Sequence, residues 1–141
     1  RTKATVFARE LISYRLIKDI CRADYAYDCA FFFDFDPYRR PGQGTLHAYR
    51  TDQDSAFKQV PPDNNDISLT CADLNQWLEM IAAYETVKTD RAHVMIAAAM
   101  LGKKVLYRPN KYHKVRGIAR FSLGEFDVTK EKQSFFPNFL I

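Results

Sequence analysis

The sequence lacks the features that would place it in several special classes of protein. No apolar run approaches the roughly 20 residues that a helix needs to cross a bilayer, and the longest run, Val94–Leu101, is far shorter. The three cysteines are an odd number without a CxxC spacing, so a disulfide scaffold or a zinc knuckle has little support. We therefore predict a protein without a transmembrane segment, located in the reducing cytoplasm.

Acidic side chains are missing from one continuous segment, Arg91–Gly124. This segment carries eight basic residues, whereas the remaining chain has 13 basic and 17 acidic residues. The formal net charge of +4 is therefore the sum of an acidic part and a strongly basic part. Such a concentration of positive charge predicts an anionic partner.

The composition that is present is that of an ordinary folded domain. The chain has 141 residues, of which 47% are hydrophobic and 27% charged, and these values argue against disorder and against two full domains. We expect a single α/β domain over residues 1–141. Residues 124–141 form a C-terminal tail with apolar side chains near its end. We expect this tail to pack on the domain, and packing on a partner subunit of an oligomer is the alternative.

Strand-like and helix-like segments alternate along the chain. The apolar spacing predicts helices over Glu10–Cys21, from a Thr70–Asp73 capping box to Tyr84, from Asp90 to Leu101, and over Tyr112–Leu123. Short apolar runs predict strands at Ala4–Ala8, Tyr27–Phe33, Thr45–Tyr49, Ile67–Leu69, Glu85–Lys88 and Lys104–Tyr107. This order predicts an α/β fold with a Rossmann-like parallel sheet and helices on both faces.

Ligands of such sheets bind at the carboxyl ends of the strands, where the next helix begins. That rule selects three loops: Arg50–Asp52, Thr89–His93 and Arg108–Tyr112.

The loop Thr89–His93 is the central candidate, and we expect its Asp90 to bind the substrate. A helix N-terminus favours an anion, and the planar guanidinium of Arg91 suits phosphate or carboxylate. His93 lies in the first turn of the same helix and can exchange protons near neutral pH. In the alternative interpretation Asp90 is only a helix cap, Arg91 a surface charge and His93 a half-buried histidine.

The two neighbouring loops supply further candidates for substrate binding. Arg50 ends a predicted strand, and its alternative role is an ion pair with Asp52 or Asp54. Asn110 either positions a substrate hydroxyl or makes the turn after a proline. Tyr112 and Lys114 lie either beside the same cleft or in a solvated basic loop.

Five segments together resemble one family. Tyr84–Val105 is similar to the "TDRLHg…AALLGKpV" signature of the polysaccharide pyruvyl transferase family, and Leu106–Lys114 to its "DNSYgKN" segment. Phe7–Ser13 is similar to its "ISVRDEyS" stretch, and Tyr27–Asp34 to its "PDPAFLLD" stretch. Ala48–Asp52 is similar to an "-RTDxE" stretch found in part of the family. The order of the segments is preserved, although Ala92 stands where the family usually has Leu.

The resemblance implies the C-terminal, donor-side half of a two-domain transferase of the GT-B type. It implies transfer of a pyruvyl group from phosphoenolpyruvate to two sugar hydroxyls in polysaccharide or exopolysaccharide biosynthesis. Arg91 and Arg50 would hold the two anionic groups of the donor, and His93 would be the general acid. The implied partners are the donor and a glycan acceptor, with no metal, cofactor or nucleic acid, while peripheral contact with a membrane stays open.

Three other functions compete with this interpretation. The chain fits the donor-binding half of a nucleotide-sugar glycosyltransferase, although the acid-free segment offers no carboxylate for a ribose. Its basic segment and tyrosines suit a nucleic-acid binding module, but no reading motif is present. A non-catalytic remnant that binds the donor is the third alternative.

Overall fold

The computed structural model describes residues 3–56 and 59–132. Its main body is a four-stranded parallel sheet with the strand order β3-β4-β5-β6. These strands are Thr45–Ala48, Thr86–Thr89, Lys104–Tyr107 and Val128–Lys130. Helices α3 (Leu74–Ala82), α4 (Ala92–Met100) and α5 (Lys114–Ser122) connect them in turn. The predicted α/β class with a parallel, Rossmann-like sheet flanked by helices is confirmed.

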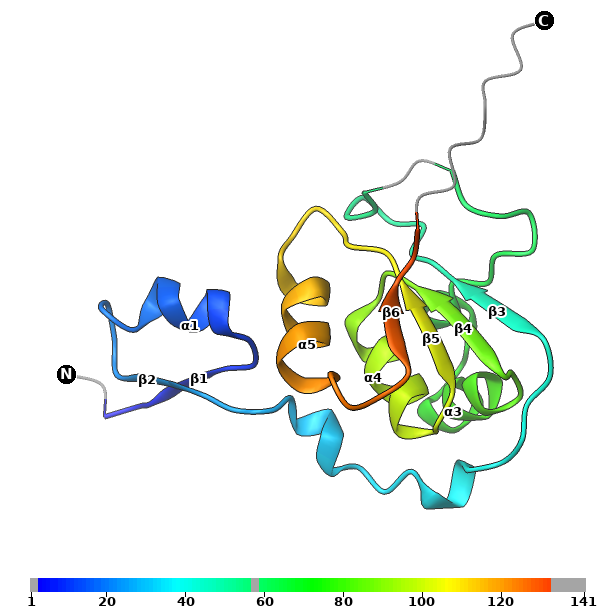
Figure 1. The fold of residues 1–141 in the computed structure, drawn as a ribbon, viewed down its shortest axis with the longest axis horizontal. Helices are drawn as coiled ribbons and strands as arrows, with labels where there is room; N and C mark the ends of the chain where they lie inside the picture. Colours follow the sequence, from blue (N-terminus) through cyan, green and yellow to red (C-terminus); the bar gives the residue numbers. More distant parts are fainter. Residues whose placement is uncertain (1–2, 57–58, 133–141) are drawn as a thin grey trace, which may run out of the picture.

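In the part of the chain that the structure describes, α3, α4 and α5 lie on one face of this sheet, not on both faces as predicted (Figure 1). The reason is topological. Each strand pairs with the next one in the chain, and right-handed connections in an unreversed order place every helix on the same side. Val87 and Val105 point to that side and are fully buried, whereas Lys88 and Leu106 point to the other side and are half-buried.

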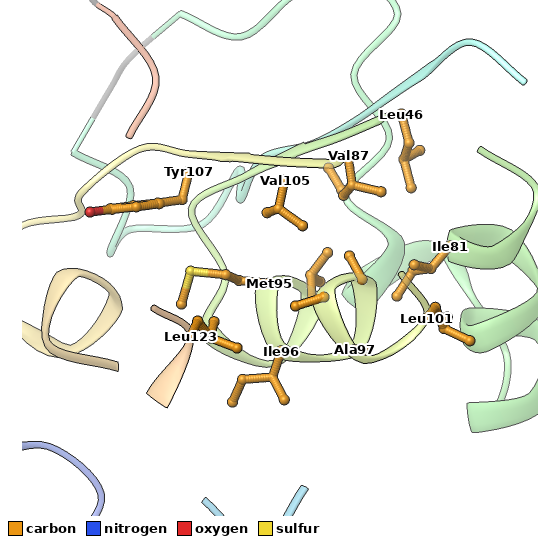
Figure 2. Close-up of a cluster of buried hydrophobic side chains, with 14 of the residues drawn as sticks. Leu46, Ile81, Val87, Met95, Ile96, Ala97, Leu101, Val105, Tyr107 and Leu123 are labelled. Carbon is orange, nitrogen blue, oxygen red and sulfur yellow. The ribbon is translucent and has the colours of Figure 1, made fainter. Parts of the chain in front are cut away.

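Helix α4 forms the centre of the core. Its residues Val94–Ala99 are all buried, as expected for a helix that is apolar all round. Figure 2 shows Leu46, Val87 and Val105 pointing from the sheet toward this helix. Gly102 ends it with a φ of 73°, a backbone conformation that glycine adopts without steric cost, so the predicted stop is confirmed.

A second, two-stranded parallel sheet lies apart from the main sheet, beside α5 (Figure 1). It consists of β1 (Val6–Ala8) and β2 (Ala23–Tyr25), joined by α1 (Leu11–Ile17). The predicted helix after Glu10 is confirmed, although none of its residues is buried. The aromatic ring of Phe121 on α5 meets the rings of Tyr25 and Tyr27, with centroids 5.6 Å and 5.5 Å apart, and joins this unit to the body.

Two predicted strands are helical turns in the structure. Within Tyr27–Phe33 a short 3₁₀ helix η1 (Cys29–Phe32) forms, because the Asp28 carboxylate accepts a hydrogen bond from the Ala30 N–H and starts a turn. A second one, η2 (Asp36–Tyr38), follows. Residues Ile67–Thr70 form α2, a single helical turn, so the predicted strand there is wrong as well.

The tail predicted at residues 124–141 is partly described. Strand β6 lies within it and extends the sheet at the edge of β5, a contact that a three-residue strand without alternation does not reveal in the sequence. The apolar end of the tail, residues 133–141, lies outside the described residues. No helix in the described part is long and apolar enough to span a membrane.

Candidate functional site

The carboxyl ends of β3, β4 and β5 lie at one edge of the sheet because the three strands are parallel and in register. Arg50, the Asp90–His93 loop and Asn110 follow these ends, so the structure brings the three predicted loops to the same edge. Their side chains do not form one cluster, however. They divide into a network around Arg91 and a separate cluster around His93.

The first group is a closed network of arginines and carboxylates. Arg91 donates to both carboxylate oxygens of Asp66, at 2.6 and 2.7 Å, and to Asp52 at 3.1 Å. Arg50 donates to both oxygens of Asp52, at 2.7 and 2.9 Å, and to Asp54 at 3.1 Å. The ion pair of Arg50 with Asp52 and Asp54 that the sequence offered as its alternative role is therefore present. Both predicted anion-binding side chains are engaged by carboxylates of this chain.

Asp90 joins this network through the backbone of Arg50. It is only 1% exposed, and its carboxylate accepts the backbone N–H of Arg50 at 2.8 Å. Burial raises the pKa of Asp90 above its ordinary value, although the Arg50 N–H and the two guanidinium groups oppose this. The alternative role of Asp90 as the cap of α4 is wrong, because the Thr89 hydroxyl accepts the Arg91 N–H at 3.0 Å instead. Substrate binding by Asp90 stays a prediction.

The second group joins three segments that are far apart in the sequence. Arg9 at the end of β1 forms an ion pair with Asp28, and its Nη1 lies 3.1 Å from Nε2 of His93. The same His93 nitrogen lies 3.4 Å from the Asp28 carboxylate. His93 is 60% exposed, so its ring is accessible while Asp28, at 3%, is enclosed.

The charge of Asp28 is stabilised locally. Burial alone would raise its pKa, but the Ala30 N–H and the Arg9 guanidinium hold the pKa of Asp28 below its ordinary value. The carboxylate is therefore ionised at neutral pH. An anionic centre, a guanidinium and an imidazole thus share a space of a few ångströms at the start of α4.

A cavity of about 360 Å³ lies beside this cluster. Its walls are almost entirely apolar and include Phe33, Phe35, Trp77 and Leu78. His93 also lines this cavity, and it is the lining residue whose side chain can exchange a proton near neutral pH. The imidazole therefore borders an apolar space on one side and solvent on the other.

A second histidine cluster contains a hydroxyl, an imidazole and a carboxylate but does not have the geometry of a catalytic triad. Nε2 of His113 lies 3.2 Å from the Ser13 hydroxyl and 3.2 Å from the Glu10 carboxylate. In a catalytic triad the hydroxyl and the acid contact different ring nitrogens, so this arrangement is not one. Glu10 accepts the N–H groups of Ile12 and Ser13 and caps α1, and it therefore anchors the β1–α1–β2 unit to the segment before α5.

The remaining predicted contacts lie after β5. The side-chain oxygen Oδ1 of Asn110 is buried and has no hydrogen-bond partner within the described residues. Tyr112 is exposed, and Lys114 is an exposed residue at the start of α5. Asn110 therefore offers an unused acceptor at this edge, whereas the roles of Tyr112 and Lys114 stay predictions.

Two site residues were not singled out from the sequence. Arg9 and Asp28 lie in the quoted family-like segments, and that resemblance was the one available signal for them. Some of the positive charges of the basic segment Arg91–Gly124 are also engaged by groups of this chain and are not available to an anionic ligand. Lys103 is buried and donates to the carbonyls of Arg40 and Ala82, and Arg108 pairs with Glu131. No group of three or more His, Cys, Asp and Glu side chains in residues 3–56 and 59–132 could hold a metal ion.

Comparisons with known proteins agree with the resemblance. A family model described as polysaccharide pyruvyl transferase matches residues 1–112. A crystal structure of a functionally uncharacterized protein from Klebsiella pneumoniae is similar, with 29% identity and a TM-score of 0.68. The match covers 84% of this chain and 50% of the other, so the chain spans about half the length of that protein. No curated protein gives a significant match.

Proposed function

The chain belongs to the polysaccharide pyruvyl transferase family, and we propose that it forms the donor side of a site that transfers a pyruvyl group from phosphoenolpyruvate to a glycan acceptor. One observation carries this proposal. Arg9, Asp28 and His93 come from three separate segments that resemble the family, and the fold brings them within hydrogen-bond or ion-pair distance of one another.

The chemistry needs one proton donor and an anion holder. An acceptor hydroxyl adds to the central carbon of the enol phosphate while the methylene carbon takes a proton from His93 and becomes a methyl group. The C–O bond to phosphate then breaks, and a second hydroxyl of the same acceptor forms the other bond of the cyclic ketal. The proton of the first hydroxyl restores His93, and the proton of the second leaves with inorganic phosphate, so that atoms and charge balance.

Arg9 is the cation best placed to hold the donor beside His93. Its Nη1 lies 3.1 Å from the imidazole, and the N-terminus of α4 adds a partial positive charge. We assign Arg91 and Arg50 a different part than the sequence suggested. Because their guanidinium groups bind Asp66 and Asp52, they hold the loops at the carboxyl edge in place, and they contact the donor only if it displaces these carboxylates.

The acceptor would approach from the loop after β5. A sugar hydroxyl is a hydrogen-bond donor, and Oδ1 of Asn110 is an acceptor without a partner among the described residues. Because this oxygen is buried, the loop must shift before a sugar hydroxyl can reach it. Tyr112 on the same loop and Lys114 at the start of α5 complete the proposed acceptor contacts. We further propose that the product is an exopolysaccharide or cell-wall glycan made in the cytoplasm.

The test is to measure donor binding and turnover separately, with the protein at its natural length. Calorimetry with phosphoenolpyruvate reports binding, and phosphate release in the presence of an acceptor glycan reports turnover. His93→Ala is expected to retain donor binding and to lower turnover by roughly 10²–10⁴-fold. His47→Ala is the matched control, because His47 pairs with Asp63 on the other face of the sheet, and its turnover should stay within about twofold of normal.

Normal turnover by His93→Ala would refute the assignment of the acid. Absence of both donor binding and phosphate release in the unmodified protein would refute the proposed function itself.

A further inference from the structure

Asp28 is buried although it carries a charge, and its two oxygens face different partners. Oδ1 accepts the Ala30 N–H at 3.0 Å and starts η1. Oδ2 faces Nη1 of Arg9 and, at 3.4 Å, Nε2 of His93. Removing a carboxylate from water is costly unless it is paired, so its position between these two side chains is a specific arrangement.

The contact between Arg9 and His93 depends on where the imidazole proton is. A guanidinium can only donate a hydrogen bond. The 3.1 Å contact between Nη1 of Arg9 and Nε2 of His93 is therefore a hydrogen bond only when Nε2 carries no proton. As a general acid, however, His93 must carry the proton that it delivers. If that proton is on Nε2, two donors face each other, and a protonated ring also sets two positive charges side by side.

We propose that Asp28 is a positioning residue that keeps Arg9 and His93 adjacent in the protonated state of the imidazole. Its Oδ2 faces both nitrogens, so it accepts from both donors and separates the two positive charges. Fixed by the backbone of η1 through its other oxygen, Asp28 also defines where these side chains lie. This inference rests on the proposed function, in which His93 is the acid and Arg9 the anion holder.

Removing the charge of Asp28 should therefore leave donor binding intact or strengthen it, while it slows proton transfer. Without the negative charge, Arg9 loses its counterion and attracts the anionic donor at least as strongly as before. The protonated form of His93 beside Arg9 is disfavoured, so proton delivery becomes slower. Merely structural damage would weaken donor binding and turnover together.

Asp28→Asn is the test variant, because its amide oxygen can still accept the Ala30 N–H. We expect kcat to fall roughly tenfold or more, while KM and the calorimetric Kd for phosphoenolpyruvate stay unchanged or decrease. Glu131→Gln is the matched control, since Glu131 is also a largely buried carboxylate that pairs with an arginine, Arg108, and it has no part in the proposed site. It should reproduce any loss of thermal stability without the loss of kcat.

A second measurement is independent of turnover. The ring resonances of His93 in NMR spectra should show a restrained imidazole in the unmodified protein and a mobile one in Asp28→Asn. A kcat within twofold of normal, a parallel loss of donor affinity, or a ring that stays restrained in the variant would each overturn the assignment of Asp28. A restrained ring in an unmodified protein without turnover would instead refute the proposed function and leave the positioning role intact.

Discussion

Replacing Arg91 by alanine should destabilise the fold, and this prediction separates structural from catalytic roles at the head of α4. Arg91 gives Asp66 two hydrogen bonds, at 2.6 and 2.7 Å, and the Asp66 side chain is only 4% exposed. The variant would leave this carboxylate enclosed without its guanidinium. His93, two residues further on, is 60% exposed, and its loss should cost little stability.

The magnitude follows from what remains around Asp66. Removing one partner of a buried ion pair typically costs roughly 3–5 kcal/mol. Asp66 keeps the Thr51 N–H at 2.9 Å and the Thr51 hydroxyl at 3.3 Å, so part of its charge stays solvated by the protein. We therefore expect Arg91→Ala to lower the free energy of unfolding by about 3 kcal/mol, at the lower end of that range.

The assay is urea unfolding at neutral pH, followed by circular dichroism. Arg91→Ala should unfold at clearly lower urea than the unmodified protein, whereas His93→Ala should lie within about 0.5 kcal/mol of it. Adding Asp66→Asn to Arg91→Ala removes the uncompensated charge and should restore part of the loss. If Arg91→Ala alone is within 1 kcal/mol of normal, the enclosed ion pair does not stabilise the loop as we argue.

Two further variants test the packing and the electrostatics elsewhere. Gly42→Ala should be strongly destabilising, by several kcal/mol, because an added Cβ would lie under 3.0 Å from backbone atoms of Tyr84; the thermal midpoint measures this, and an unchanged midpoint would contradict the close approach. Hydrogen bonding by Arg50 lowers the pKa of Asp52 from 3.8 to about 2, so Asp52 contributes stability above pH 4 that is lost as the pH falls toward 2. Screening at a 35% exposed side chain reduces this contribution to about 1 kcal/mol. Asp52→Asn should therefore be less stable by that amount at pH 6 and by only about a third of it at pH 2.5, and equal differences at both pH values would refute the ion pair's contribution.

Elements with strong periodicity and clear ends could be predicted from the sequence. Lys104–Tyr107 is a strand with the bounds expected, and the apolar helix before Gly102 ends as expected. The strands β2 and β6 were missed because three residues are too few to show an alternation. The run of aromatics from Phe31 to Phe33 is apolar enough for a strand, but a local hydrogen bond to an aspartate starts a 3₁₀ turn there.

For the site, the sequence allowed us to predict which loops lie together but not which side chains contact each other. The parallel order placed Arg50, Arg91 and His93 at the same edge without any coordinates. Which charges pair is a tertiary property, and Arg91 finds its partner in Asp66, 25 residues earlier. A side chain chosen for an anion by its chemistry can equally be satisfied by a carboxylate of its own chain, and composition does not distinguish these outcomes.

The adjacent residues Arg9 and Glu10 tie the β1–α1–β2 unit to two distant parts of the chain. Arg9 lies 3.1 Å from His93, 84 residues away in the sequence, while Glu10 lies 3.2 Å from His113. Contacts of such high sequence separation close large loops and form slowly compared with local helices. We therefore expect the sheet and its helices to form before the β1–α1–β2 unit docks, so that the His93 cluster is assembled last. Partly folded chains would therefore have a nearly complete core and no site.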